Sequence, residues 1–538
     1  MRNSWVKWIL AAGSALVMTA AANDPFETSK QLEVFTAVLQ QVQTQYVDDI
    51  GVEQAVGSAI KGMLKELDPY TVYYPEDQIE DVRLMQTGEY GGIGCVIQKI
   101  NSDIYISDLK NSGPAKAAGL MVGDIITKID ETIIENFTIS DVSSLLKGTP
   151  ESEVAVVVER QGGRKTFTFN RAKIKTKAVP FYGMRNDGIG YIYLDAFTVK
   201  AASDVRNALN ELKKQQPKGL ILDLRGNGGG LLMEAVKIVS YFSSTRDTIV
   251  STRGRGGKIE DVYRNAAKTI FEDLPLAVLV DERSASASEI VAGAIQDLDR
   301  GVILGEKSFG KGLVQQIKPL PFGAQMKVTV AKYYTPSGRC IQRVNYDRDK
   351  NGKRTKKAEQ RSFTTKNGRP VVDGDGIYPD STLSDLYYPE FVSAASAKGL
   401  DLKYAALVMP SMNGTQAGTF AIDQAAWERF ESLLEAEEFS YESIGERKLN
   451  QLKEATEDLD YLNEEDFDAL LEKVEQRKGQ VLQDQRTAIA EYLSDFLVQK
   501  HFGLEGTLER GLERDTQVNT AAQILLDPTL MQRLLSSK

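Results

Sequence analysis

The sequence predicts a multidomain α/β protein, in which an α/β core lies between helical regions. Its 538 residues suggest several domains, and 42% hydrophobic residues allow ordinary cores. Within residues 178–387, short apolar runs typical of buried strands alternate with helical patterns. Residues 388–538 are richer in Glu, Gln, Leu, Lys and Ala and poor in Gly, which is typical of amphipathic helices.

Charge and cysteine content exclude several classes of function. The 65 basic and 75 acidic residues give a net charge of −10, which argues against nucleic acid or an anionic membrane surface as the partner. Cys95 and Cys340 lack the spacing of metal ligands. The serine chemistry expected from the motifs described below needs no metal and no cofactor. The two cysteines could pair in an oxidising compartment, but burial as small apolar residues is the favoured interpretation.

Residues 1–22 have the pattern of an export signal. Arg2 and Lys7 precede an apolar run, and Ala20 to Ala22 offer a small-residue cleavage site. A buried helix is disfavoured because no acidic residue occurs before Asp24. We therefore expect an exported protein, periplasmic in a Gram-negative cell, and an uncleaved signal would add weak membrane association.

Residues 23–86 are predicted to form an N-terminal helical region. Apolar residues recur at three- and four-residue steps between positions 26 and 67. The run Asp68-Pro69-Tyr70-Thr71 then has the chemistry of a turn. This segment alone indicates no more than a small helical bundle.

Residues 87–173 resemble a PDZ domain, which has an α+β fold. The resemblance rests on a glycine-rich loop and on the later G-P-A-K-A-A-G-L and V-G-D-I-I runs, 113–120 and 122–126. A glycine-rich loop alone would indicate a hairpin or bulge. In a PDZ domain the loop's main-chain N–H groups bind a peptide's terminal carboxylate, and the strand at 95–100 accepts the peptide by strand addition. The predicted loop residues are Tyr90, Gly91, Gly92, Ile93 and Gly94.

The predicted core, residues 174–387, begins with a strand near 188–192 and an amphipathic helix at 203–212. The apolar run at 217–224 is typical of a buried parallel strand. It leads into the glycine-rich run 225–230 (R-G-N-G-G-G). Such a loop could hold a phosphate, but no G-K-[ST] follows, so that function is discounted.

Residues 278–315 carry the strongest chemical signal. An apolar run at 276–280, typical of a buried strand, leads into S-A-S-A-S and then into a helical pattern that starts at Glu289. Free N–H groups at a helix start would stabilise negative charge that develops beside a nucleophile. Alternatively, Ser286 and Glu289 have the spacing of a capping box, in which the serine is merely structural.

The base that would activate such a serine cannot be an ordinary histidine. The single histidine, His501, lies in the charged C-terminal segment, which disfavours a Ser-His-Asp triad. Lysine is the usual substitute, and Lys311 lies between glycines in F-G-K-G.

The S-A-S-A-S-E-I and G-E-K-S-F-G-K-G-L-V-Q runs resemble those of the carboxy-terminal processing proteases, tail-specific serine peptidases with a PDZ domain. The resemblance implies that Ser286 is the nucleophile, that Lys311 is the general base and that Gln315 orients the lysine. It also implies a serine protease core related to the crotonase and Clp-protease folds.

The same resemblance implies an oxyanion hole. The run D-L-R-G-N-G-G-G matches the family's D-L-R-x-N-x-G-G, with Gly228 where proline is common. A main-chain N–H of Gly229, or of its neighbour Gly230, would join that of Ala287. In the core, the runs 331–339 and 376–380 match further motifs of the family.

One departure from the family lies in the PDZ-like segment. Glu151 occupies a turn position where the family often has glycine.

Residues 388–538 are predicted to form a C-terminal helical domain, outside the family's catalytic motifs. The clearest helical patterns lie at 423–439, 464–477 and 487–498. Dimerisation or control of substrate access is the role that we expect, so the protein could form a homo-oligomer through its helical regions.

The expected function is cleavage of exported proteins near their C-terminus, with protein or peptide substrates whose C-termini are free. Lys311 must be neutral to accept the Ser286 proton, so we expect an apolar pocket around its amine. Two alternatives remain: a non-catalytic PDZ scaffold on an inactive protease core, and a crotonase-like acyl-CoA enzyme.

Overall fold

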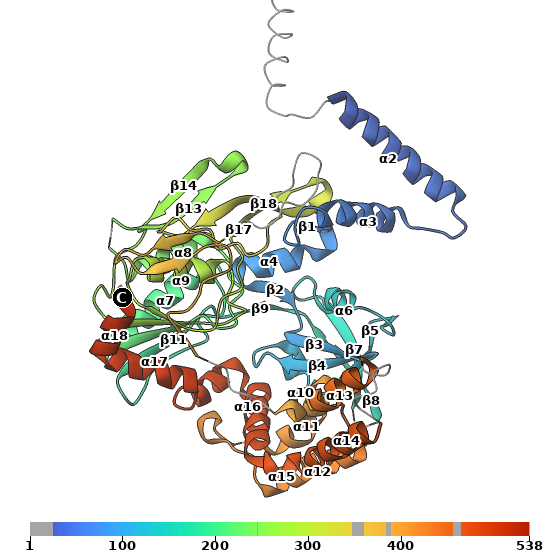
Figure 1. The fold of residues 1–538 in the computed structure, drawn as a ribbon. Coiled ribbons are helices and arrows are strands. Elements are labelled where there is room, and N and C mark those ends of the chain that lie inside the picture. Colours follow the sequence, from blue (N-terminus) through green and yellow to red (C-terminus); the bar gives the residue numbers. More distant parts are fainter. Residues whose placement is uncertain are drawn as a thin grey trace, which may run out of the picture. The chain divides into compact units, whose positions relative to one another are not determined.

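The computed structural model describes residues 25–160, 162–244, 246–346, 360–383, 389–412, 414–455 and 464–536. The predicted signal at 1–22 lies outside these residues and stays a prediction. The chain forms two compact units: Met1–Tyr73 with Met326–Val328, and Tyr74–Gln325 with Thr329–Lys538. Figure 1 shows the elements of both units.

The N-terminal segment is helical, as its periodicity predicts. Its elements are α2 (Pro25–Gln45), α3 (Val52–Lys65) and β1 (Val72–Tyr74). The predicted turn also forms, because Asp68 Oδ1 accepts the main-chain N–H groups of Tyr70 and Thr71, both at 2.8 Å. In the second unit, η1 (Glu76–Gln78) and α4 (Ile79–Thr87) follow.

The segment with the PDZ resemblance folds as a small antiparallel β domain. Its main sheet has the order β3-β4-β5-β7-β8 with β6 on β5, while β2 pairs with β9. On β7, buried and more exposed residues alternate, as expected for a strand with one face on a core. The elements are β2 (Glu89–Gly92), β3 (Cys95–Ile100), β4 (Asp103–Leu109), α5 (Pro114–Ala117), β5 (Ile125–Ile129), β6 (Thr132–Ile133), α6 (Ile139–Leu146), β7 (Glu153–Arg160), β8 (Gly163–Asn170) and β9 (Ala172–Lys175).

A six-stranded sheet forms the centre of the α/β core. Its order is β10-β11-β12-β15-β16-β21, with only the β10–β11 pair antiparallel. Three strands are buried along their whole length, which explains their continuous apolar sequences: β12 (Gly219–Asp223), β15 (Leu276–Val280) and β16 (Val302–Gly305). The others are β10 (Phe181–Met184), β11 (Ile189–Tyr193) and β21 (Ser381–Thr382).

Helices cover both faces of this sheet. One apolar cluster joins the sheet to α7 (Ala201–Lys214), α8 (Leu232–Ser240) and α9 (Ala287–Asp297). A second cluster joins the opposite face to α17 (Thr516–Leu526) and α18 (Pro528–Leu535), from the far end of the chain. Parallel pairing places the carboxyl ends of β12 and β15 at the same edge, so the loops that follow them lie together.

A smaller sheet lies beside the core. Strand β13 pairs antiparallel with β14 and with β18, and β17 pairs with β18. The remaining elements of this region are β13 (Thr248–Arg253), η2 (Arg255–Gly257), β14 (Ile259–Arg264), β17 (Leu313–Pro319), η3 (Pro321–Gly323), β18 (Gln325–Tyr334), β19 (Ser362–Thr364) and β20 (Pro370–Val372).

The C-terminal region is helical. Its remaining elements are α10 (Glu390–Ala397), α11 (Leu400–Val408), η4 (Met409–Met412), η5 (Ala417–Thr419), α12 (Gln424–Ala436), α13 (Ile444–Ala455), α14 (Glu464–Gly479), α15 (Val481–Asp484) and α16 (Arg486–Gly511). Helix α16 extends well beyond the predicted 487–498. It is broken at Gly503, where φ is 75°. Among the described helices, none has the length and apolar character needed to cross a membrane.

The β domain and the helical region share one apolar cluster. It includes Ile100, Tyr105 and Val122 from the β domain and Leu400 and Leu402 from α11. The helical region therefore packs directly on the β domain, and its last helices pack on the core sheet.

Candidate active site

Ser286 lies at the junction of strand β15 and helix α9, as the sequence predicts. It is the N-cap residue of α9 and is partly exposed. Its φ of 55° and ψ of −109° lie outside the β region that an N-cap residue usually adopts. Strained main chain of this kind is concentrated at functional sites.

Glu289 fixes this turn. Glu289 Oε2 accepts Ser286 N at 2.8 Å, which is the glutamate half of a capping box. Glu289 N, however, donates to the main-chain O of Ser286 at 2.9 Å, and among the described residues no hydrogen bond caps the helix through the Ser286 hydroxyl. The structural role in this turn therefore belongs to Glu289, and Ser286 remains a candidate nucleophile.

The Glu289 carboxylate also holds the segment that contains Lys311. It is completely buried, and its Oε2 accepts Lys311 N at 2.9 Å. Its Oε1 accepts Ser308 Oγ at 2.5 Å and Gly310 N at 2.7 Å. Burial raises the pKa of Glu289, while these hydrogen bonds act in the opposite direction. Glu289, which the sequence indicates only as part of a capping box at a helix start, thus joins the two segments that carry the predicted dyad.

Tyr333 joins the same two residues from the opposite side of their main chain. Its hydroxyl lies 3.0 Å from Ser286 O and 2.8 Å from Lys311 O. Burial raises the pKa of Tyr333 well above its usual value, so the hydroxyl keeps the proton that it donates. Glu289 and Tyr333 therefore fix both the N–H and the C=O groups of Ser286 and Lys311.

The pairing of the Ser286 and Lys311 side chains stays a prediction. The Gln315 side chain donates to Thr329 Oγ1 at 3.3 Å and not to Lys311. The orienting role of Gln315 and the apolar pocket around the Lys311 amine stay predictions.

The glycine-rich loop after β12 lies against Ser286. A Cβ atom added to Gly229 would lie 2.8 Å from Ser286 Cβ, 2.9 Å from Ala287 N and 2.6 Å from Ala285 O. Gly229 also has a φ of 100°, which disfavours any other residue. The loop and the turn that carries Ser286 are therefore in direct contact, and only glycine fits at position 229.

The main-chain N–H groups of the glycine loop and of the Ser286 turn differ in whether a protein acceptor already occupies them. Gly229 N donates to Asn227 Oδ1 at 2.8 Å, so this predicted oxyanion donor is engaged. Among described residues, no acceptor is bonded to Gly230 N or to Ala287 N, the first N–H of α9. Of the two glycines that the sequence offers, Gly230 is the one whose N–H group no described acceptor occupies.

Asn227 connects the two loops. It is completely buried, its Nδ2 donates to Leu194 O at 2.7 Å, and its main-chain O accepts Ala285 N at 3.0 Å and Ser288 Oγ at 2.8 Å. No local sequence pattern predicts a role for Asn227 or for Tyr333. Their only sequence signal was their place in runs that resemble the family's landmarks.

In the predicted carboxylate-binding loop, two main-chain N–H groups could donate to a ligand. Within the described part of the chain, Ile93 N and Gly94 N donate to no protein acceptor. Gly91 N, in contrast, donates to Glu80 Oε2 at 2.7 Å. A cavity of about 40 Å³ adjoins the loop and is lined by Tyr90, Ile93, Gly94, Cys95, Ile97, Ser143, Leu146 and Lys147.

Both cysteines are free and partly buried. Burial raises the pKa of the Cys95 thiol to about 12 and also raises the pKa of Cys340. Cys95 therefore presents a neutral thiol to the small cavity beside the loop. No group of three or more His, Cys, Asp or Glu residues suited to a metal ion occurs in the described ranges.

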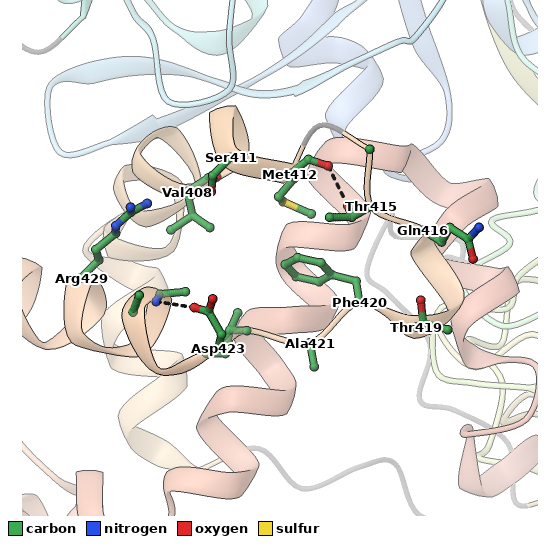
Figure 2. Close-up of a pocket in the computed structure, with 14 residues that line it drawn as sticks. Val408, Ser411, Met412, Thr415, Gln416, Thr419, Phe420, Ala421, Asp423 and Arg429 are labelled. Atoms are coloured by element: carbon green, nitrogen blue, oxygen red, sulfur yellow. Dashed lines mark hydrogen bonds between the residues drawn. The ribbon is translucent and has the colours of Figure 1, made fainter.

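A larger hollow, about 580 Å³, lies in the C-terminal helical region (Figure 2). The lining residues come from the end of α11, from η4 and η5, from the first part of α12 and from the segments between η4 and α12. Asp423, which lines the hollow, accepts Ala426 N at 2.8 Å as the cap of α12. None of the predicted catalytic or carboxylate-binding residues lines it.

Four family models match the chain in succession. They are the activating protease CtpB N-terminal domain (residues 5–78), the PDZ domain (91–170), peptidase family S41 (188–350) and the probable PDZ-protease C-terminal helical domain (391–525). This order confirms the predicted fold class.

Individual proteins are also similar to this chain. The carboxy-terminal-processing protease of Bartonella bacilliformis is 38% identical over 355 residues, which are 64% of this chain and 81% of that protein. The chloroplastic C-terminal processing peptidase of Tetradesmus obliquus is 33% identical over 310 residues, 54% of this chain and 66% of that protein. The solved photosystem II D1 C-terminal processing protease has 28% identity and a TM-score of 0.39, and covers 65% of this chain and 86% of its own.

Proposed function

The chain belongs to the carboxy-terminal-processing proteases, S41 serine peptidases with a PDZ domain, and from this premise we propose that it cleaves exported proteins with a Ser286–Lys311 dyad. The observation that carries the proposal is the double main-chain link between these two residues. Glu289 accepts both of their N–H groups and Tyr333 contacts both of their carbonyls.

In the first step, neutral Lys311 takes the proton of Ser286 Oγ while this oxygen attacks the scissile carbonyl carbon. The carbonyl oxygen becomes an oxyanion, and N–H donors beside Ser286 stabilise it. Gly230 N and Ala287 N are suited to this role because no described acceptor engages them. Gly229 N could join them only by leaving Asn227 Oδ1.

Collapse of this intermediate breaks the C–N bond, and Lys311 gives its proton to the leaving amine. The acyl chain is then an ester on Ser286. Water attacks the ester while Lys311 takes one of its protons. Lys311 gives this proton to Ser286 Oγ as the ester C–O bond breaks, and the product acid loses the second proton to solvent as it leaves as a carboxylate. The cycle balances without a metal ion or a cofactor.

The PDZ domain would bind the free C-terminus of the substrate. The N–H groups of Ile93 and Gly94 support this role because no described acceptor occupies them. The adjoining cavity, lined mainly by apolar residues and about 40 Å³ in volume, suits a small apolar side chain. The N-terminal segment 1–22 supports export to the periplasm because of its signal-like sequence.

The test compares the wild-type protein without residues 1–22 with Ser286→Ala, Lys311→Ala and the control Lys318→Ala, which alters an exposed lysine on β17. Each is incubated with an unfolded protein that ends in a free apolar C-terminus, and with the same protein amidated there. We expect cleavage by the wild type and the control only, and slower cleavage after amidation. Cleavage by Ser286→Ala would contradict the assignment of the nucleophile, and no cleavage by any form would favour a scaffold.

A further inference from the structure

The loop that carries Gly229 and Gly230 is braced from the C-terminal end of the chain. The loop begins with Arg225, whose Nη2 lies 2.5 Å from Asp223 Oδ2 and 2.9 Å from Asp515 Oδ2. Asp515 belongs to the C-terminal helical region, directly before α17. The guanidinium group therefore lies between a carboxylate of the core and a carboxylate from a distant part of the sequence.

Asp515 is itself held rigidly. It is the N-cap residue of α17, and its Oδ1 accepts Gln517 N at 2.8 Å and Val518 N at 3.0 Å. This leaves Oδ2 to face Arg225. The Gln517 side chain adds a longer contact, with Oε1 3.4 Å from Arg225 Nη1.

Helix α17 is fixed on the core sheet, so its cap cannot move independently. Its apolar residues are buried against β12 and β15, the two strands whose ends carry the glycine loop and the nucleophile turn: Val518, Ala521, Ala522, Ile524 and Leu525. A carboxylate on such a support can define the position of the loop's first residue.

The other contacts at the start of the loop hold its main chain and not the Arg225 side chain. Tyr193 Oη donates to Arg225 O at 3.2 Å, and Gly226 N donates to Asp281 Oδ1 at 2.9 Å. Asp223 lies only two residues before Arg225, so it moves with the strand end. Asp515 is thus the charged contact that ties the Arg225 side chain to a separate element.

We propose that Asp515 is a positioning residue for hydrolysis, and that it acts through Arg225 on the loop that presents the oxyanion donors. The proposal rests on the proposed function. It gives the C-terminal helical region a part in the active site, in addition to any role in assembly or substrate access.

The test uses Asp515→Asn in the full chain. Asparagine is as good an N-cap residue as aspartate, so α17 keeps its cap while Arg225 loses the charged oxygen. The matched control is Glu513→Gln, two residues earlier in the chain. The native Glu513 side chain accepts Asn186 N at 2.9 Å and lies 3.4 Å from Arg185 Nη2, so its contacts are not with the glycine loop. For both variants kcat, KM, Tm and inhibition by a peptide boronic acid, which forms a tetrahedral adduct on the serine, are measured.

We expect Asp515→Asn to lower kcat by about tenfold. This effect is smaller than the decrease in kcat expected when an oxyanion donor is removed, because here the donor is only displaced. Affinity for the boronic acid should fall in proportion, while KM and Tm match those of Glu513→Gln. Equal kcat values in the two variants, or a lower kcat with unchanged boronic acid affinity, would overturn the inference alone. A wild-type protein that does not cleave would instead overturn the proposed function and the inference with it.

Discussion

The main-chain nitrogens of Ser286 and Lys311 donate to the same carboxylate oxygen, Glu289 Oε2, at 2.8 and 2.9 Å. Two segments that are separated along the chain thus converge on one buried charge. A nucleophile and its base must be held to within about half an ångström of a productive geometry. The shared carboxylate and the Tyr333 hydroxyl supply such a constraint through the main chain.

Replacing Glu289 with glutamine should damage both folding and activity. The amide group would face N–H and O–H donors that now share a carboxylate, so we expect the free energy of unfolding to fall by about 3 kcal/mol. Urea denaturation and the peptidase assay measure the two effects. Glu282→Gln, at an exposed position in the same turn, is the control and should leave both unchanged. A Glu289→Gln protein with wild-type stability would contradict the role of the carboxylate.

Tyr333→Phe removes only the hydroxyl that contacts Ser286 O and Lys311 O. We expect kcat to fall about tenfold, because small displacements of reacting groups are costly, with a loss of about 1–2 kcal/mol in stability. The neighbouring Tyr334→Phe is the matched control, since the ring of Tyr334 stacks under Arg253 and would remain. Equal kcat values for the two variants would show that the hydroxyl does not position the dyad.

Gly229→Ala should abolish cleavage. The added methyl group would lie within 3 Å of Ala285 O, Ser286 Cβ and Ala287 N, so we expect a loss of at least 10²-fold in kcat as the oxyanion donors are displaced. Gly228→Ala, where an added Cβ meets no atom within 4 Å, is the control and should stay within about twofold of the wild type. Activity retained in Gly229→Ala would place the loop elsewhere during catalysis.

Glu151→Gly should stabilise the PDZ domain. Glu151 has a φ of 70° and lies in the turn before β7, at a position where the resembled family often has glycine. Glycine adopts this conformation without strain, so we expect a gain of about 1 kcal/mol. Thermal unfolding of the two proteins measures the change. Glu151→Ala would keep the strain and should show no gain; a gain of the same size there would refute the explanation.

Cys95 should react very slowly with iodoacetamide. Its pKa is raised to about 12, so the reactive thiolate is scarce at pH 8, and the rate should rise as pH approaches 12. Compared with the protein unfolded in urea, alkylation at pH 8 should be about a thousandfold slower. Peptide mapping separates Cys95 from Cys340. Equal rates in the folded and unfolded protein would contradict the burial of this thiol.

The sequence predicts the core well where a local pattern reflects burial. The strand β15 coincides with its apolar run, and β12 lies inside the run at 217–224. Both strands are buried on two faces, so their sequences are apolar without interruption. The serine turn and the glycine loop were also found, because each carries a residue pattern that few other structures require.

The rest of the site depends on contacts that no local pattern encodes. Tyr333 lies in β18, and nothing in its neighbourhood shows that its hydroxyl reaches Ser286 and Lys311. Asp515 meets Arg225 only because α17 packs on the core sheet. Likewise, no local pattern shows that Asn227 Oδ1 accepts Gly229 N and so leaves Gly230 N as the glycine N–H group without a described acceptor.

The most direct test of the central claim is chemical replacement of the base. In a chain whose natural cysteines, Cys95 and Cys340, are changed to alanine, Lys311→Cys is alkylated with bromoethylamine, which restores a lysine-like amine with a lower pKa. We predict that Lys311→Cys is inactive, that alkylation restores cleavage, and that the acid limb of the pH–rate profile moves to lower pH. Full activity before alkylation, or restored activity with an unmoved acid limb, would contradict Lys311 as the base that activates Ser286.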